Sequence, residues 1–226
     1  ALFAEVELKG ASRESKLSVD GDVAKVLLSY AYLQLARYTE DVELYTKSYE
    51  NAIDVINGGK YTMLPYSELT TNGFNDVSNK SWMWGLDVTR ENSTGLASFF
   101  GQMDIHTYSY AAAGGILGID KNLYEEIPTT DKRRDWFNPN ISYCPENKFY
   151  DPEKFNPYLN GSLDGVDRDW LNDAVYMRVE EVFLLASEAA WRSGDLAKAK
   201  DYLTALVAQR DTTVATQIAG YSEEEY

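Results

Sequence analysis

The chain has 226 residues, of which 44% are hydrophobic and 25% charged. This length can bury a full-sized core, and the composition excludes a disordered or low-complexity polypeptide. The 36 acidic side chains outnumber the 21 basic ones, and the net charge of -15 argues against a nucleic-acid partner because it repels phosphate backbones. The sequence has no stretch of roughly 20 apolar residues that could cross a bilayer, and its single cysteine cannot form an internal disulfide.

The first predicted elements are two helices between residues 23 and 56. In each, apolar residues recur at spacings of three and four, which marks one face of a helix. Gly58 and Gly59 follow the second helix, where a left-handed turn favours glycine. The apolar faces consist of Val23, Val26, Leu27, Tyr30, Ala31 and Leu35 in the first helix and Tyr45, Tyr49, Ala52, Ile53 and Ile56 in the second. We therefore predict a helical hairpin.

Residues 60–173 differ in composition from the chain on either side. All six prolines lie in this range, together with many Gly, Asn and Asp residues, which are typical of turns. We expect a loop-rich insert with short strands, such as one over residues 82–88. A connection of this length in a compact protein is usually functional. The insert is therefore where we expect a ligand site.

Two more helices are predicted after the insert. The first ends at Gly194, and Asp195 can cap the second. Their apolar faces consist of Val179, Val182, Phe183, Ala186, Ala189 and Ala190, and of Leu196, Ala199, Leu203, Leu206 and Val207. The pair with its glycine turn resembles a tetratricopeptide repeat, although the pattern alone is equally compatible with ordinary helical packing.

The two ends indicate an interior piece of a longer protein. The sequence begins without methionine, and Ser222 and Glu225 have the spacing of a helix capping box with no helix after it. We expect one all-α domain over residues 1–226. Its parts are a first hairpin region at 1–59, the insert at 60–173, and a second hairpin with a truncated end at 174–226.

No catalytic or metal-binding residue is predicted. His106 is the only histidine, so neither a catalytic triad nor a metal site with several histidines can be built. Asp164, Asp167, Asp169 and Asp173 offer oxygen ligands for calcium, but without the spacing of an EF-hand, so we expect a polar loop and no cofactor. A pair of insert carboxylates suited to glycoside hydrolysis stays open, because the sequence does not give their separation.

The aromatic residues are the most informative part of the composition, with 17 Tyr, 8 Phe and 5 Trp. A sugar ring has an apolar C–H face and a rim of hydroxyls, so a sugar site needs flat aromatic rings beside polar groups. We predict a glycan site in which the stacking residues are Tyr108, Tyr110, Trp136, Tyr143 and Trp170 and the polar ones Asp104 and Asn138. Alternatively, Trp170 anchors the helix that follows it, and Arg133 fixes Trp136 in the core.

Several segments, in this order, resemble the SusD/RagB family of outer-membrane glycan-binding lipoproteins. They are residues 27–38 (LLSYAYLQLARY), 48–63 (SYENAIDVINGGKYTM), the apolar run 81–86, 131–134 (DKRR) and 177–195 (MRVEEVFLLASEAAWRSGD). Together they extend over nearly the whole chain. Residues 207–210 (VAQR) depart from the Asn and Arg-x-Arg pattern that is usual in the family, and the typical signal peptide and lipid-bearing cysteine are absent from this sequence.

The resemblance implies a right-handed superhelix of tetratricopeptide-like helix pairs that carries a loop-rich ligand-binding part. It also implies a protein that binds oligosaccharides without catalysis and delivers them to a SusC-like TonB-dependent transporter. Such a protein lies on the outer membrane at the cell surface, held by a lipid anchor outside this segment. The alternatives from the residues alone are a protein-interaction scaffold built from the helix pairs and, less favoured, a glycosidase.

Overall fold

The computed structural model describes residues 15–105, 109–145 and 171–226. These residues form two compact units. Unit 1 contains residues 15–64, 80–85 and 175–226, and unit 2 contains residues 65–79, 86–105, 109–145 and 171–174. Most of unit 2 falls within the range that the sequence assigns to the insert.

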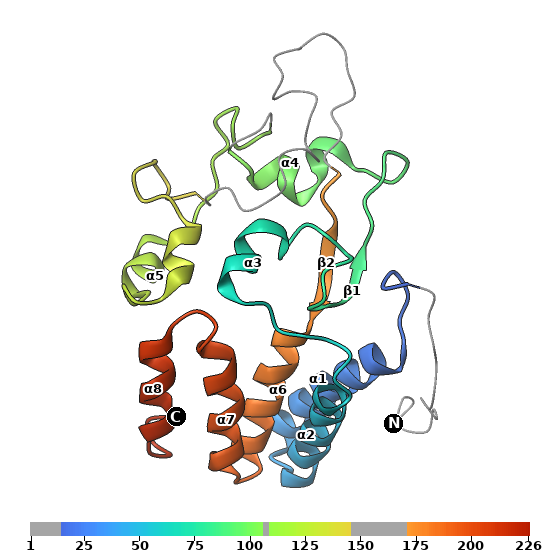
Figure 1. Ribbon diagram of the computed structural model, residues 1–226, viewed down its shortest axis with the longest axis vertical. Helices are drawn as coiled ribbons and strands as arrows, with labels where there is room; N and C mark the ends of the chain where they lie inside the picture. Colours follow the sequence, from blue (N-terminus) through green and yellow to red (C-terminus); the bar gives the residue numbers. More distant parts are fainter. Residues whose placement is uncertain (1–14, 106–108, 146–170) are drawn as a thin grey trace. The chain divides into compact units, whose positions relative to one another are not determined.

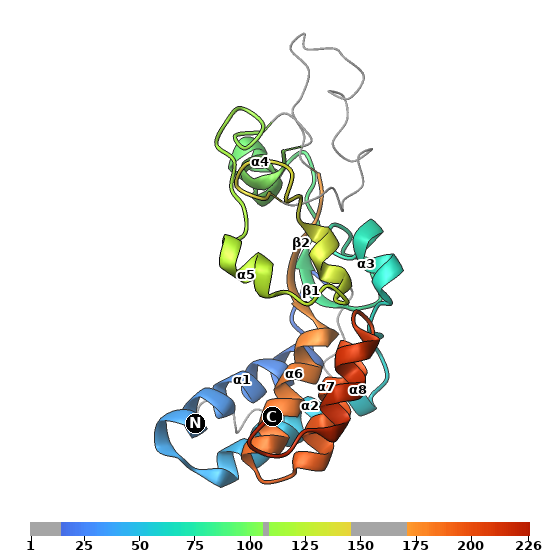
Figure 2. The ribbon, with the colours of Figure 1, turned by 90° about the vertical axis from the view of Figure 1, so that its left-hand side faces the viewer.

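Unit 1 is built mainly from helices. Those in its described part are α1 (Gly21–Thr39), α2 (Val42–Asn57), α6 (Val179–Arg192), α7 (Leu196–Val207) and α8 (Thr212–Gly220). Each helix packs on the next one in that order (Figures 1 and 2), and α1 also contacts α6. Packing between successive helices is typical of helical repeat proteins. The mainly helical structure confirms the predicted all-α class, and both predicted hairpins are present, as α1–α2 and α6–α7.

Aspartate residues begin four of these helices. In each case the carboxylate accepts a hydrogen bond from a backbone N–H of the first turn, a cap that stabilises a helix by about 1 kcal/mol. The capping residues are Asp20, Asp41, Asp195 and Asp211. α8 was not predicted from the sequence, because its residues, TTVATQIAG, include several weak helix formers. After α8, the backbone N–H of Ser222 donates to Glu225 Oε2 at 2.7 Å, as the capping box predicts.

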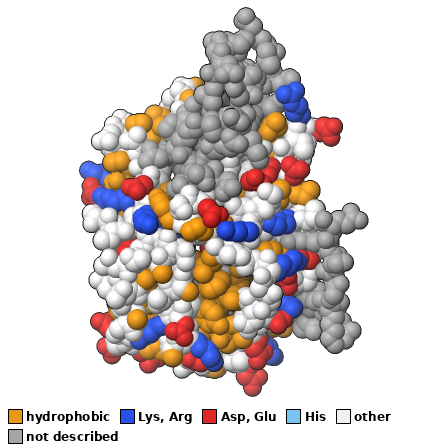
Figure 3. All heavy atoms as spheres, in the orientation of Figure 1, with side chains coloured by type: hydrophobic (Ala, Val, Ile, Leu, Met, Phe, Trp, Pro, Cys, Tyr) orange, Lys and Arg blue, Asp and Glu red, His pale blue; other side chains and the backbone are white. Residues whose placement is uncertain are grey.

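The core of unit 1 lies between α1, α2 and α6. Small residues on α6 let the helices approach closely, and large aliphatic residues of α1 and α2 pack against them. Ser29 of α1 and Ser48 of α2 are buried in this contact, and each hydroxyl donates to the other residue's carbonyl oxygen at 2.8 Å. Figure 3 shows a band of apolar side chains over α6, between α7 and α2.

Two short strands complete unit 1. β1 (Trp82–Leu86) and β2 (Ala174–Arg178) pair in a two-stranded sheet. β1 lies within the segment 82–88 where a strand was predicted, and Trp82 on it is fully buried. β2 was not predicted, because it runs directly into the periodic pattern of α6. The ring of Trp84 packs edge-on against Tyr176 of β2, with centroids 5.1 Å apart.

A buried ion pair holds the junction between β2 and α6. Glu180 Oε1 accepts hydrogen bonds from Arg178 Nη2 at 2.6 Å and from the backbone N–H of Leu64 at 3.1 Å. Arg178 Nε donates to Ser81 Oγ at 3.3 Å, and the backbone N–H of Val179 donates to the carbonyl of Ser81 at 2.8 Å. The pair therefore joins the start of α6 to the segments that follow α2 and precede β1.

Unit 2 consists of short elements joined by long loops. Its elements are α3 (Tyr66–Asn72), η1 (Gly95–Ala97), α4 (Phe99–Met103), α5 (Lys121–Glu126) and η2 (Lys132–Trp136).

Asp173 connects distant parts of unit 2. Its carboxylate accepts from the backbone N–H of Val77 at 2.8 Å and of Val88 at 3.0 Å. The other three aspartates considered for calcium lie outside the described residues. Across the described ranges, no group of three or more His, Cys, Asp and Glu side chains is placed to hold a metal ion.

Candidate functional site

Tyr110 and Tyr143 are the predicted stacking residues that the structure presents on the surface of unit 2. The side chain of Tyr143 is 73% exposed and that of Tyr110 is 57% exposed. Large apolar rings at such exposure are available to a ligand. Two other predicted stacking residues, Tyr108 and Trp170, lie outside the described residues.

Tyr143 lies on a strained loop. Tyr143 and Cys144 have φ angles of 67° and 47°, in the left-handed region that side chains other than glycine adopt at a cost of about 1 to 2 kcal/mol each. Hydrogen bonds close the loop on itself: the N–H of Asn138 donates to the carbonyl of Pro145 at 2.8 Å, and that of Cys144 to Ile141 at 3.0 Å. Strain kept by surrounding contacts is frequent at ligand-binding positions.

Gly118 packs directly under this loop. A Cβ at Gly118 would overlap the carbonyl oxygen of Tyr143, so a glycine is required for the close approach. Next to it, the N–H of Ile119 donates to the carbonyl of Cys144 at 3.3 Å. The segment around Gly118 therefore holds the strained backbone in place.

The same segment leads to Tyr110. The carbonyl of Tyr110 accepts from the N–H of Gly115 at 2.9 Å, and the N–H of Tyr110 donates to the carbonyl of Gly101 at 2.9 Å. Gly115 and Gly118 are three peptides apart, which spans at most roughly 11 Å. The backbones of Tyr110 and Tyr143 are therefore held in one connected set of loops, which we call the aromatic loops (residues 98–105, 109–119 and 138–145).

The remaining predicted residues lie in less accessible positions. Trp136 is half-buried at the end of η2, and its ring packs edge-on against Phe74 with centroids 5.5 Å apart. Asn138 is half-buried, and its side-chain oxygen accepts from the N–H of Asn140 at 3.0 Å. Asp104 is 1% exposed, so its carboxylate does not face solvent. Its backbone carbonyl accepts a hydrogen bond from the hydroxyl of Ser109.

Arg133 is bound to a neighbouring carboxylate. Its guanidinium lies on Asp131, with Nε 3.0 Å from Oδ1 and Nη2 2.5 Å from Oδ2. The next residue, Arg134, donates to the carbonyls of Tyr124 and Ile127 at 3.1 and 2.6 Å and lies over the Tyr124 ring. These two arginines fix η2, which precedes the Tyr143 loop in the chain.

Two exposed apolar side chains of the aromatic loops were missed by sequence reasoning. Phe99 at the start of α4 is 64% exposed, and Leu117, next to Gly118, is 49% exposed. The sequence carries one weak signal for them, the cluster Gly114, Gly115 and Gly118, which is typical of a flexible loop. The structure shows instead that Gly118 is needed for a close backbone contact.

Cys144 lies beside Tyr143 and offers no reactive nucleophile. Burial raises the pKa of its thiol, and the nearby Arg134 offsets only part of that rise. A thiol with a raised pKa is mostly protonated at neutral pH and is a poor nucleophile. His106 lies outside the described residues.

Comparison with solved structures identifies the architecture. The chain is similar to a SusD-like carbohydrate-binding protein from Bacteroides vulgatus, with a TM-score of 0.66 and 23% identity, over 94% of this chain and 43% of that one. A SusD superfamily protein from Bacteroides thetaiotaomicron matches with a TM-score of 0.61 and 22% identity, over 96% and 46%. Surface glycan-binding protein A from Bacteroides uniformis matches with a TM-score of 0.56 and 16% identity, over 92% and 48%.

The chain spans less than half the length of these three structures. Neither the protein-family models nor the curated protein sequences give a match to it. At this level of identity the structural likeness concerns the fold, which agrees with the resemblance read from the sequence. The chain therefore has the SusD-like fold, and it matches a little less than half of each of these three structures.

Proposed function

We propose that this chain is the glycan-binding part of a cell-surface protein and that the aromatic loops of unit 2 contact the sugar. The observation that carries the proposal is Tyr143, a 73% exposed ring on a strained loop that Gly118 and backbone hydrogen bonds hold in place. Because the backbone of the loop is held in place, stacking of this ring on a sugar face costs little backbone entropy.

Other features support binding rather than catalysis. The neighbours in structure include proteins described as carbohydrate-binding and glycan-binding. In the described residues of the aromatic loops, the carboxylate of Asp104 is buried, whereas hydrolysis of a glycosidic bond needs two carboxyl groups that flank the substrate. Tyr110, Phe99 and Leu117 add exposed apolar surface on the same aromatic loops.

The finer part of the proposal concerns the whole protein. We infer that it hands oligosaccharides to a SusC-like TonB-dependent transporter in the outer membrane and is held there by a lipid anchor. Among the described residues, none of the helices has the length and hydrophobicity of a membrane span. The inference rests on the SusD-like fold and on the motifs that resemble the family. Co-purification of the full-length protein with its transporter tests it.

The test of glycan binding is retention on affinity gels that contain plant, host or microbial polysaccharides. Changing Tyr143 to Ala should weaken retention on the bound polysaccharide about five- to thirtyfold, which corresponds to a loss of about 1 to 2 kcal/mol for one stacking ring. Tyr38→Ala is the matched control, because Tyr38 is 87% exposed on the regular helix α1 of unit 1. Its retention should equal that of the parent chain.

The outcomes separate the alternatives. Equal retention of the Tyr143→Ala and Tyr38→Ala variants would contradict the assignment of the aromatic loops. If no polysaccharide is retained, the helix pairs of unit 1 become the better candidate, as an interaction scaffold. Release of shortened sugars from a retained polysaccharide would instead reveal a glycosidase.

A further inference from the structure

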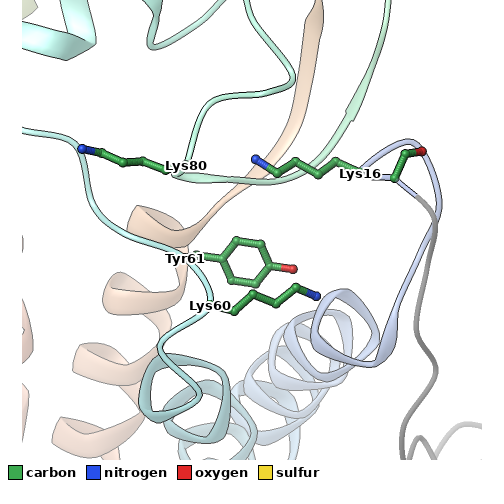
Figure 4. A pocket seen from close by; sticks show the side chains of 5 residues that line it. Lys16, Lys60, Tyr61 and Lys80 are labelled. Atoms are coloured by element: carbon green, nitrogen blue, oxygen red, sulfur yellow. The ribbon is translucent and has the colours of Figure 1, made fainter.

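Lys60 and Arg134 each join separate segments of their own unit, but they bind different groups. In unit 1, Lys60 and Tyr61 lie beside the first turn of α1 (Figure 4), and Lys60 Nζ is 2.5 Å from the carboxylate of Asp20, which caps that helix. In unit 2, Arg134 of η2 donates instead to backbone carbonyls. Arg134 therefore fixes the position of the backbone that supplies these carbonyls.

The two carbonyls that Arg134 binds lie at the end of α5. Arg134 Nη1 donates to the carbonyl of Ile127 at 2.6 Å and to that of Tyr124 at 3.1 Å. The central carbon of its guanidinium also lies 4.4 Å from the centre of the Tyr124 ring, within the range of a cation–π contact. Hydrogen bonds from a charged donor are stronger than those between neutral groups. Arg134 therefore ties η2 firmly to the end of α5.

This tie reaches the first end of the Tyr143 loop through Phe137. The ring of Phe137 packs edge-on against the ring of Tyr124, with centroids 6.4 Å apart. The next residue, Asn138, donates its backbone N–H to the carbonyl of Pro145 at 2.8 Å, and this hydrogen bond closes the loop. The position of Tyr124 on α5 therefore sets where the loop begins.

The second end of the loop returns to the same arginine. Pro145 is fully buried, and Cys144 before it is half-buried. Burial raises the pKa of the Cys144 thiol, and the positive charge of Arg134 lowers it in part. The interaction of a charge with a titrating group falls with distance and is screened by salt. Arg134 is therefore close to both ends of the segment that carries Tyr143.

The backbone at Tyr143 needs contacts of this kind. Tyr143 and Cys144 both have φ angles in the left-handed region, and such a backbone persists only where the surrounding structure determines it. Gly118 supplies one contact, by packing under the loop. Arg134 supplies another, because it joins the elements from which the loop starts.

We propose that Arg134 is a positioning residue for glycan binding, which holds both ends of the Tyr143 loop against α5 and so keeps the exposed Tyr143 ring where it can stack on a sugar. Its role is to hold the loop, since Nη1 and the face of its guanidinium are already bound to α5. The glycan part of this inference rests on the proposed function. The hold on the loop rests on the contacts alone.

The experiment compares Arg134→Met with the parent chain in two measurements. The first is retention on affinity gels that contain starch, xylan, galactomannan or hyaluronan, and the second is the rate at which iodoacetamide alkylates Cys144, the only cysteine. On a gel that retains the parent, retention of the variant should fall about tenfold, as expected for the loss of two charge-assisted hydrogen bonds at a partly exposed site. Alkylation at pH 8 should be about fivefold faster, because a displaced loop exposes the thiol.

The direction of the second effect separates positioning from a purely electrostatic role. If the loop stayed in place, loss of the Arg134 charge would raise the pKa of the Cys144 thiol further and slow its alkylation. Slower alkylation, or retention equal to that of the parent, therefore overturns the proposal. A loss of retention with an unchanged alkylation rate also overturns it, because Arg134 would then act on the sugar itself.

Lys121→Met is the matched control, because it removes the same charge from the exposed side of α5, where Lys121 Nζ lies 3.6 Å from Glu125. It should match the parent in both measurements. Arg134→Lys keeps the charge without the planar fork, so its retention should lie between those of Arg134→Met and the parent, and it carries the test if Arg134→Met does not fold by circular dichroism. If no gel retains the parent chain, the proposed function fails, and the alkylation rates alone decide whether Arg134 holds the loop.

Discussion

Unit 1 and unit 2 are built on different principles. In unit 1, aspartate caps and periodic apolar residues produce helices of 9 to 19 residues that pack on one another. In unit 2, the helices α3, α4 and α5 have only five to seven residues. The backbone there is held by hydrogen bonds between loops. Helices gain most of their stability from packing of an apolar face. Short loops without such a face depend on individual backbone contacts.

The difference predicts where substitutions should act on stability and where they should act on the proposed binding. The buried pair of Arg178 and Glu180 and the serine contact between α1 and α2 stabilise unit 1. The left-handed conformations of Tyr143 and Cys144 instead cost free energy, and neighbouring contacts maintain them. We expect changes in unit 1 to act on unfolding, and changes in the aromatic loops to act on ligand binding.

The largest expected effect is on the buried ion pair. Glu180→Gln should lower the free energy of unfolding by about 3 kcal/mol, because it removes the carboxylate of a buried ion pair with Arg178. Urea denaturation followed by circular dichroism measures the change. Glu50→Gln is the control, since Glu50 is exposed on α2 and makes no ion pair among the described residues. Equal stability of the two variants would contradict the role assigned to the pair.

The second prediction concerns the Tyr143 loop. Gly118→Ala places a methyl group against the carbonyl of Tyr143, so the loop must shift, at a cost of about 1 to 3 kcal/mol. Retention on the bound polysaccharide should fall about tenfold, and alkylation of the neighbouring Cys144 should accelerate. The helical circular dichroism signal should stay close to that of the parent, because most of the helical residues that the structure describes belong to unit 1.

Gly220→Ala controls for the added methyl group, because a Cβ there meets no atom within 4 Å. This variant should match the parent chain in both retention and alkylation rate. A Gly118→Ala variant that behaves in the same way would show that the close approach does not position Tyr143.

The regular parts of unit 1 could be predicted because their signals are local. The two hairpins follow from spacings of three and four, from the Asp195 cap and from Gly194, whose φ of 92° ends α6 as a glycine turn. α8 was not predicted because its threonines are weak helix formers and its apolar face, which consists of Val214, Ala215 and Ile218, is short. β2 was not predicted because its residues lead directly into the apolar residues of α6, which recur at helical spacing.

The aromatic loops could be predicted only in part. Residue type indicated that exposed tyrosines belong to the insert, and the structure shows Tyr110 and Tyr143 exposed there. Residue type did not separate them from Asp104, which is buried, because burial in a loop depends on tertiary contacts and not on a periodic pattern. The left-handed backbone at Tyr143 was not predicted for the same reason, since the close approach of Gly118 to this loop is a tertiary contact.

A smaller effect is expected on the thiol of Cys144. Because burial raises its pKa, the rate of alkylation should increase about tenfold per pH unit from pH 7 up to 9, without levelling off below the ordinary thiol pKa of 9.0. The urea-unfolded chain is the control, and its rate should be several-fold higher at pH 7.5. Bound polysaccharide should slow the reaction of the folded chain further. A rate that is equal in the folded and unfolded chains would contradict the packing of the Tyr143 loop.

The smallest effect is expected on an ion pair between helices of unit 1. Glu188 of α6 accepts from Arg192 Nε at 2.7 Å and from Arg37 of α1, whose Nε lies at 3.1 Å. Burial raises the pKa of Glu188, but the two arginines outweigh it, so the pKa lies below the ordinary 4.5. A lowered carboxyl pKa stabilises the fold above the unfolded-state value, and this contribution is lost as the pH falls through the folded-state value.

Glu188→Gln should therefore lower the free energy of unfolding by about 0.5 to 1 kcal/mol at pH 7, since the pair is partly exposed and screened by salt. The difference between variant and parent should shrink below pH 4.5, because the parent carboxylate then becomes protonated. Urea denaturation at pH 7, 5 and 3 measures it. A difference that is constant across this range would mean that α1 and α6 are joined by packing alone. Retention on polysaccharide at pH 7 should not change, because the contact lies within unit 1 and the aromatic loops belong to unit 2.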